Sequence, residues 1–384
     1  MIENIIDLKL KNIKDIINTI RLSGLMSRKQ LAEDLGLSFA TVSNVCNSLI
    51  EHGVLIEDFA KAEKTIGRTT KFITLNKDMY KIIGISMEGA GVIRICLSNL
   101  KNEIISQKKY MYQANSTIDG FVEDIASIYF DYLKETGVDE ENIIGIGIAL
   151  SAVFSQVDEC IVSSEISILE NQPLKKLIEA RTKKTVFIDN DANLCIVSVK
   201  NFTNSENIVY LYINIGLGIG TIQKGKVTRG ERGFASEICH MPLGLLEKPC
   251  WLCGSSNCLQ TDISKSGFAE KFSAVKNIEA SWDDYIEALN NSDDDAVNVA
   301  RENAVIIGKA LSSVVNLLDS EKIIIGGIPK VLFDELKVPA LKEINDRKVV
   351  RSMPDFKLIF DDESYEHIIS GATEAVFDKW CPNI

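Results

Sequence analysis

Hydrophobic and polar residues follow a helical period up to about residue 78 and a mixed pattern after it. Four isoleucines near the start recur at helical spacing and predict one buried helix face. Two shorter helices are expected after Ser27 and Ser38, because serine is a favoured N-cap residue. Residues 54–56 and 71–75 are expected to form two strands. The isoleucines are Ile13, Ile16, Ile17 and Ile20.

After residue 78, aliphatic runs alternate with longer segments of helical spacing. Short aliphatic runs bounded by glycine predict buried strands, and longer periodic segments predict helices. Such alternation is typical of an α/β fold, whose sites lie at the ends of strands. Strands are expected at 81–100 (two strands joined by a glycine turn), 142–150, 186–188, 208–215 and 322–325. Helices are expected at 119–136, 173–181 and 295–318, and glycine-rich turns at 216–220 and 326–327.

The composition fits a soluble globular protein of two or three domains. The chain has 384 residues, of which 46% are hydrophobic and 25% are charged, and about 150 residues per domain is usual. It has no run near the roughly 18 apolar residues that cross a membrane. Its charged N-terminus lacks the apolar segment of a secretory signal. We therefore expect a cytoplasmic protein with no membrane partner.

Charge is distributed unevenly along the chain. The formal net charge is -12, and residues 1–78 contain eleven Lys and Arg against ten Asp and Glu, which leaves about -13 on the remainder. An acidic protein does not coat nucleic acid nonspecifically. A near-neutral N-terminal module on an acidic body is compatible with DNA binding confined to one end.

The third predicted helix presents short polar side chains on its exposed face. A short helix, a glycine turn and a second helix make a helix-turn-helix, and hydroxyl and amide groups reach base edges and phosphates in a major groove. An arginine at the tip between the two strands would enter the minor groove or contact a phosphate. The alternative is a packing module that binds no nucleic acid. The predicted DNA-binding residues are Ser38, Phe39, Thr41, Ser43, Asn44, Asn47, Gly67 and Arg68.

Three cysteines and one histidine cluster in a single segment. The chain's nine cysteines are too sparse for a disulfide framework, which favours a metal site in a reducing compartment. Three thiolates and an imidazole form a standard closed zinc site, and a full set of four protein ligands makes the predicted zinc structural. The alternative is four unrelated buried side chains. The predicted ligands are His240, Cys250, Cys253 and Cys258.

The ordered glycine segments, an Asn-Asp pair after a buried strand and the cysteine cluster resemble the ROK family (repressors, open reading frames and sugar kinases), in its xylose-repressor-like branch. The resemblance implies a winged helix-turn-helix at 1–78 and a two-lobed, actin-like (ribonuclease H-like) sugar-kinase domain at 79–384. Lobe 1 would comprise about 79–190 and a C-terminal helix at about 370–384, and lobe 2 about 191–369. The matching segments are Ile188–Asn193, Ile213–Gly220, Gly233–Met241, Leu317–Gly327 and Gly371–Ala372.

The resemblance also implies a sugar site. In ROK kinases an aspartate takes the proton of the attacking sugar hydroxyl, and Asp191 matches it. Around the sugar site and the metal loop the sequence departs from the family in three places: Gln260 replaces a Glu, residues 151–153 replace Pro-Gly-Pro, and residues 250–253 form Cys-x2-Cys instead of Cys-x-Cys. We therefore expect a reshaped sugar pocket. The sugar-binding residues implied are Asn190, Asp191, Glu237, His240 and Gln260.

The family's phosphate-binding turn is altered in this chain. ROK kinases carry Gly-x-Asp-x-Gly-Gly-Thr-Lys, and the matching run begins at Gly84. Its magnesium-handling carboxylate has become a serine, a glycine has become a glutamate that repels phosphate, and the Thr-Lys pair is lost. Because phosphoryl transfer depends on positioning and neutralising the phosphates, we expect no kinase activity. The altered positions are Ser86, Glu88, Ala90 and Gly91.

These observations favour a sugar-responsive repressor of carbohydrate-utilisation genes, with an inactive kinase-like body as its sensor. Two recognition helices one turn apart match a palindromic operator, so a homodimer or higher oligomer is expected. One alternative is an ATP-dependent sugar kinase, which Asp191 supports and Glu88 opposes. Another is a repressor whose body senses a partner protein instead of a sugar.

Overall fold

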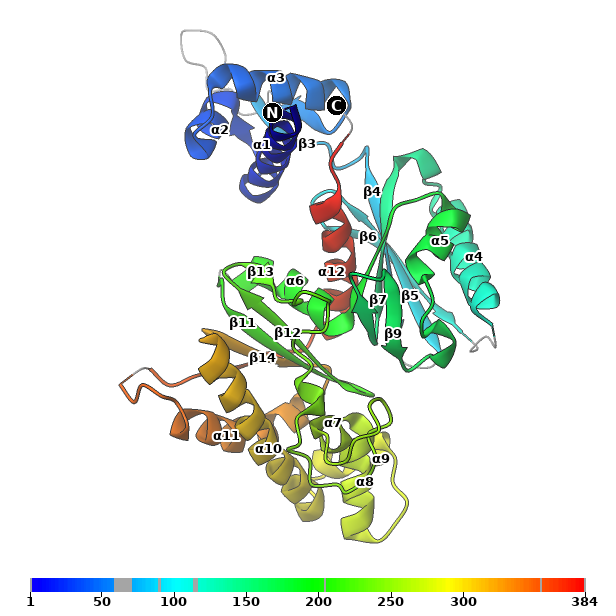
Figure 1. Ribbon diagram of the computed structural model, residues 1–384, viewed down its shortest axis with the longest axis vertical. Coiled ribbons are helices and arrows are strands. Elements are labelled where there is room, and N and C mark those ends of the chain that lie inside the picture. Colours follow the sequence, from blue (N-terminus) through cyan, green and yellow to red (C-terminus); the bar gives the residue numbers. More distant parts are fainter. Residues whose placement is uncertain are drawn as a thin grey trace.

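The computed structural model describes residues 2–58, 71–88, 91–112, 117–203, 205–352 and 354–382. This part of the chain forms an N-terminal module and two lobes, each built on a five-stranded sheet (Figure 1). The α/β class predicted from the alternation of strands and helices is confirmed. Among these described residues, no helix is both long and apolar enough to cross a bilayer.

The N-terminal module consists of three helices and a small antiparallel sheet. Both predicted caps are confirmed, since Ser27 Oγ accepts a hydrogen bond from Gln30 N (3.2 Å) and Ser38 Oγ from Thr41 N (3.0 Å). The four isoleucines are buried in the module's core. The two predicted strands are joined by a third, at Met26–Ser27, which is too short to show a periodic pattern in the sequence. The elements are α1 (Ile2–Ser23), β1 (Met26–Ser27), α2 (Arg28–Leu35), α3 (Phe39–Glu51), β2 (Leu55–Asp58) and β3 (Phe72–Leu75).

Lobe 1 is the first α/β body. Its elements are β4 (Lys81–Glu88), β5 (Val92–Asn99), β6 (Ile104–Met111), α4 (Ile118–Thr136), β7 (Ile143–Leu150), β8 (Ala152–Ser155), β9 (Cys160–Ser164), α5 (Leu174–Thr182) and β10 (Val186–Asn190). The sheet order is β10-β7-β4-β5-β6, with β4, β7 and β10 parallel. Apolar residues of α4 and α5 form one core with this sheet, and β8 and β9 form a separate hairpin.

Lobe 2 is the second α/β body. Its elements are α6 (Asp191–Thr203), β11 (Ile208–Ile213), β12 (Leu217–Gln223), β13 (Lys226–Val227), α7 (Leu259–Asp262), α8 (Lys265–Lys276), α9 (Trp282–Asn290), α10 (Asp294–Leu318), β14 (Lys322–Gly326), α11 (Lys330–Asp346) and β15 (Leu358–Asp361). The sheet order is β13-β12-β11-β14-β15. Helices α8 to α11 form the large apolar core of this lobe with one face of the sheet.

The C-terminal helix α12 (Ser364–Lys379) connects the two lobes. It packs on β4, β7 and β10 of lobe 1 and on α6 of lobe 2, so that α6 and α12 share one core with both sheets. A Cβ added at Gly371 would strike the carbonyl oxygen of Leu194, which shows how closely α12 and α6 approach. The helix begins at Ser364, before the predicted start at about residue 370. Gly371 lies inside the helix, where it permits the contact with α6, and does not mark the start of the helix.

The glycine run at 216–220 is not the strand-end turn that we expect. Strand β11 ends at Ile213, and most of the run lies inside β12, antiparallel to β11. A Cβ added at Gly220 would strike the backbone oxygen of Ala192 in α6. Glycine serves both turns and close backbone approaches, and its spacing in a sequence does not separate the two uses.

The N-terminal module packs directly on α12. Arg21 of α1 forms a two-point ion pair with Glu374, with Nη1 donating to Oε1 at 2.7 Å. The Arg21 guanidinium lies 4.1 Å from the ring centroid of Phe377, and Phe377 belongs to the module's apolar core. The C-terminal end of α12 accordingly lies on the side of the module in Figure 1. Helix α12 therefore contacts both lobes and the module.

Candidate functional site

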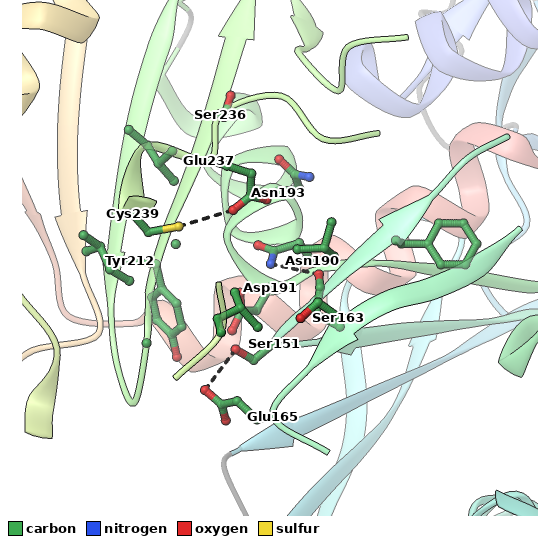
Figure 2. A pocket seen from close by; sticks show the side chains of 18 of the residues that line it. Ser151, Ser163, Glu165, Asn190, Asp191, Asn193, Tyr212, Ser236, Glu237 and Cys239 are labelled. Carbon is green, nitrogen blue, oxygen red and sulfur yellow. Dashed lines mark hydrogen bonds between the residues drawn. The ribbon is translucent and has the colours of Figure 1, made fainter. Parts of the chain in front are cut away.

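A cleft between the lobes contains three of the five predicted sugar-binding residues. Asn190 ends β10, Asp191 begins α6, and Glu237 faces them from lobe 2 (Figure 2). Asn190 Nδ2 donates to the oxygen of Ala152 (3.2 Å), and its Oδ1 accepts from Ala192 N (2.9 Å). These two bonds fix the amide at the junction between strand and helix.

Buried carboxyl groups give the cleft its electrostatic character. Burial, together with the charges of Glu165 and Glu237, raises the pKa of Asp191 to about 7, although a backbone hydrogen bond from Ala192 acts in the opposite direction. Burial also raises the pKa values of Glu165 and Glu237. None of the described residues that line the cleft is Lys, Arg or His. The cleft therefore offers many hydrogen-bonding oxygens to a ligand rich in hydroxyl groups.

Glu165 is a lining residue that sequence reasoning missed. It directly follows β9 of lobe 1, and Ser151 Oγ donates to its Oε1 at 3.4 Å. Figure 2 shows Ser151 between Glu165 and Asp191. A single acid in a serine-rich segment carries no motif, so no signal in the sequence identifies it.

An ion pair that sequence reasoning also missed joins the lobes at the cleft wall. Arg229 Nε of lobe 2 donates to Asp189 Oδ2 of lobe 1 at 2.8 Å. The other carboxylate oxygen of Asp189 accepts from Asn190 N (2.8 Å) and Asn193 Nδ2 (3.0 Å). Asp189 therefore has partners for both oxygens, which distinguishes it from the three lining carboxyls discussed above.

The structure does not place His240 and Gln260 among the residues that line the cleft. Gln260 is 3% exposed, and its Nε2 donates to Cys250 Sγ at 2.7 Å. His240 ends a short 3-10 turn that begins at Ile238, next to Glu237. Both residues thus lie on the side of the cysteine cluster, and Gln260 Oε1 is 3.7 Å from the Cβ position of Gly216, which lines the cleft.

The four predicted metal ligands come together. One ligand atom from each of His240, Cys250, Cys253 and Cys258 lies within 4.8 Å of the others. His240 Nδ1 is 3.8 Å from Cys250 Sγ, and the sulfurs of Cys253 and Cys258 are 3.4 Å apart. Zinc bonds of about 2.3 Å to sulfur and 2.0 Å to nitrogen in a tetrahedron require separations of this size. The donor set and its spacing fit one zinc ion.

The phosphate side of the body is described only in part. Ser86 of β4 is 2% exposed, and its hydroxyl has no hydrogen-bond partner among the described residues. Gly91 precedes β5 with a φ of 139°. The side chain of Glu88 and the whole of Ala90 lie outside the described residues. Ser86 thus provides no carboxylate at the position where the family resemblance implies a magnesium-handling group.

The predicted DNA-binding residues of α3 form one surface. Ser38, Phe39, Asn44 and Asn47 are exposed, and Thr41 and Ser43 are half-buried. The hydroxyls of Ser38 and Thr41 bond to each other at 2.8 Å as part of the helix cap. Gly67 and Arg68 lie outside the described residues.

A cation beside α3 was missed by sequence reasoning. Arg28 Nη2 donates to Asn47 Oδ1 and to Glu57 Oε1, both at 3.0 Å. Arg28 is the first residue of α2, and these bonds connect α2 to α3 and to strand β2. The polar pattern of α3 alone could not indicate this contact, because it depends on how the helices pack.

The two-lobed body and its cleft define a class of protein. The model of the ROK family matches residues 82–367, and the chain therefore belongs to the ROK family. It is 28% identical to the xylose repressor of Caldicellulosiruptor bescii over 364 residues, 89% of each chain. It is 24% identical to the DNA-binding transcriptional dual regulator NagC of Escherichia coli, over 86% of this chain and 83% of NagC.

Solved structures confirm the fold. A ROK family transcriptional regulator described as a homologue of the E. coli MLC protein superposes with a TM-score of 0.85, covering 97% of both chains at 21% identity. A ROK glucokinase from Streptomyces griseus, solved with glucose and AMPPNP, has a TM-score of 0.63 and covers 77% of this chain and 98% of its own, at 20% identity. The predicted family and actin-like fold class are both confirmed.

Proposed function

We propose that this chain is a sugar-responsive transcriptional regulator, a repressor of carbohydrate-utilisation genes that binds a palindromic operator as a homodimer or higher oligomer. The names of the xylose repressor and NagC support this proposal. The observation that carries it is the packing of the N-terminal module on α12, the same helix that packs on both lobes around the cleft. A ligand in the cleft thereby acts on the element that holds the module.

The coupling follows from differential affinity. A carbohydrate that binds one arrangement of the lobes more tightly shifts the population toward it. Because α6 and α12 approach within backbone contact at Gly371, a rotation of lobe 2 moves α12. The Arg21–Glu374 pair transmits that movement to α1. The two DNA-binding modules of a dimer then change their relative positions.

The body is proposed to bind carbohydrate without phosphorylating it. Asp191 has the position and the raised pKa of a general base. Ser86, however, offers no carboxylate for magnesium, and the lining residues include no cation to neutralise a triphosphate. The serine at position 86 and the absence of Lys and Arg from the described cleft lining both support the proposed loss of phosphoryl transfer.

A structural zinc ion is proposed at His240, Cys250, Cys253 and Cys258. Such an ion holds its four ligands in fixed positions and leaves no place for a reactive water. Glu237 lies only three residues before His240, so the ion would fix the segment that presents this carboxylate to the cleft. Gln260 would orient one thiolate by donating to Cys250 Sγ.

The proposal is tested by operator binding. A duplex selected from a random-sequence library by the full-length protein is labelled, and its fluorescence anisotropy is measured with and without xylose, glucose or N-acetylglucosamine. We expect sequence-specific binding whose Kd changes at least tenfold with one of these sugars. Asn44→Ala should weaken binding by roughly 10- to 100-fold, while Asn290→Ala, an exposed asparagine at the end of α9, should not. Absence of sequence-specific binding under every condition would contradict the proposal.

The coupling has its own test. Arg21→Ala leaves the carboxylate of Glu374, a 7% exposed side chain, without its partner, and such losses cost about 3 kcal/mol. We expect this variant to bind operator but to show less than a twofold change in Kd with the active sugar. The double variant Arg21→Met with Glu374→Met keeps the stems and removes both charges, so it should recover thermal stability. A full sugar response in Arg21→Ala would show that the module is not coupled through this pair.

A further inference from the structure

The metal loop contributes two side chains to the cleft. Residues 250–253 read Cys-Trp-Leu-Cys, and both intervening side chains, Trp251 and Leu252, line the cleft. The side chains of the flanking cysteines meet in the metal cluster. Trp251 is nevertheless 52% exposed, so a large aromatic ring borders the cleft with about half of its surface uncovered. An exposed tryptophan fixed beside a carboxylate-lined cleft is a feature that the sugar site described so far does not use.

Three side chains from different elements converge at Gly216. A Cβ placed on this glycine would lie 3.7 Å from Glu165 Oε1, from Trp251 Cζ2 and from Gln260 Oε1. Glu165 belongs to lobe 1, Trp251 to the metal loop and Gln260 to α7. Because Glu165 approaches from the opposite lobe, a carboxylate of lobe 1 and an indole edge of the metal loop both lie beside Gly216.

The side chains around Gly216 differ from those around Gly218, which lies beside the predicted sugar-binding residues Asn190 and Asp191. A Cβ placed on Gly218 would lie 3.7 Å from Asp191 Oδ1 and 3.8 Å from Asn190 Oδ1. Gly216 and Gly218 are two residues apart, and two residues of extended chain span at most about 7 Å. The Asn190–Asp191 pair and the Glu165–Trp251 pair therefore mark two neighbouring positions along the same segment.

The chemistry at Gly216 suits a second sugar ring. An aromatic side chain offers a broad apolar surface, and packing the C–H face of a pyranose against it removes apolar area from water on both partners. The same ring carries hydroxyl donors at its edge, and a carboxylate such as Glu165 accepts them. A single sugar held at Asn190 and Asp191 would leave the indole in water.

We infer that Trp251 and Glu165 form a second subsite, which makes the effector a disaccharide or longer oligosaccharide in preference to its monosaccharide. This inference rests on the proposed function, because it assumes that the cleft binds carbohydrate. It assigns the extra residue of the metal loop to specificity: Trp251 packs on the second ring, and Glu165 binds its hydroxyls from lobe 1.

Titration calorimetry on the full-length protein tests the inference. Three pairs of probes are compared: xylose with xylobiose, glucose with cellobiose, and N-acetylglucosamine with its β-1,4 dimer. We expect one disaccharide to bind at least tenfold more tightly than its monosaccharide. Trp251→Ala should reduce this preference to less than twofold, and Trp251→Phe should keep most of it. Leu245→Ala, which truncates a 64% exposed apolar residue in the segment between His240 and Cys250, is the matched control and should behave as wild type.

Two further measurements keep the result interpretable. Zinc content is determined for every variant, to show whether Trp251→Ala has lost its metal. Glu165→Gln changes a residue of lobe 1 that is not a metal ligand, and it should lower the disaccharide preference with the zinc content unchanged. The chain has three tryptophans, so the change in fluorescence on disaccharide binding should largely disappear in Trp251→Phe. Equal affinities for all pairs, or a preference unchanged in Trp251→Ala and Glu165→Gln, would overturn the inference and leave the proposed function standing. Absence of binding by every carbohydrate would overturn both.

Discussion

The sugar side and the phosphate side of this protein have different chemistry. On the sugar side, Asn190, Asp191 and Glu237 face one cleft, and hydrogen bonds fix their positions. On the phosphate side, Ser86 stands buried with no partner among the described residues, and Gly220, in the glycine run where we expect a strand-end turn, packs against α6. The difference supports the proposal that ligand recognition is retained while phosphoryl transfer is lost. Three sets of variants and one activity assay would break or sharpen this comparison.

Removal of the metal should have the largest effect, and only on the sugar side. Cys258→Ser deletes one of four ligands, and structural zinc contributes on the order of 10 kcal/mol to the folding of zinc-finger peptides. We expect zinc content, measured by mass spectrometry, to fall from one ion per chain to less than 0.1. Carbohydrate affinity should fall more than tenfold, because Glu237 lies beside the ligand His240.

Cys160→Ser is the matched control for the metal prediction. Cys160 begins β9 outside the cluster and is half-buried, so its replacement should leave zinc content and carbohydrate affinity unchanged. Cys258→Ser protein that keeps a full zinc complement and normal carbohydrate binding would refute the proposed metal site.

The buried carboxyl of Asp191 should make stability depend on pH. Its pKa in the folded protein, about 7, lies above its ordinary value of 3.8, so the folded state binds this proton more tightly than the unfolded state does. The favourable contribution is complete below about pH 4 and is lost as the pH rises through about 7. Asp191→Asn should therefore be roughly 2–4 kcal/mol more stable than wild type at pH 8 and about equal at pH 4.

Urea unfolding at the two pH values checks the Asp191 prediction, because the difference between variant and wild type isolates this group from the other acids. Asparagine retains the oxygen that accepts from Ala192 N (2.8 Å in the native carboxylate). An equal stability difference at pH 4 and pH 8 would mean that Asp191 is ionised throughout this range and is not held in a desolvated site.

Gly220→Ala should have the smallest effect and bears on the phosphate side. The added methyl group strikes the backbone of α6, and overpacking of this kind costs about 1–3 kcal/mol. Gly216→Ala, whose added Cβ has no neighbour nearer than 3.7 Å, should cost much less. Thermal unfolding compares the two. If Gly220→Ala kept wild-type stability and instead altered nucleotide binding, the glycine run would be a phosphate cradle after all.

Features that depend on neighbouring residues in the sequence were predictable. The caps at Ser27 and Ser38 are local hydrogen bonds, and α10 was found by periodicity to within one residue of its observed start. The metal cluster was predictable because three of its ligands lie within nine residues and their chemistry is restrictive. The family resemblance predicted that Asn190, Asp191 and Glu237 share one site, and all three line the same cleft.

Features that depend on packing were not predictable. Glu165 and Arg28 acquire their positions only when distant elements meet, and neither belongs to a motif. The glycines at 216–220 were misassigned because the contact that requires Gly220 comes from α6, an element separated from it in sequence. The contact of the Gln260 amide with Cys250 Sγ likewise depends on packing and was not predicted. Each error concerns which partner a side chain meets, since composition and spacing do not encode partners.

The central claim is that the body binds carbohydrate and has lost phosphoryl transfer. The most direct test incubates the purified, zinc-loaded full-length protein with magnesium-ATP and each probe sugar, and measures phosphorylated product by mass spectrometry alongside sugar binding by calorimetry. We predict saturable binding of at least one carbohydrate, unaffected by ATP, with no product above background. Phosphorylated sugar formed at ordinary enzymatic rates, on the order of 1–1000 per second, and lost in Asp191→Asn, would contradict the claim.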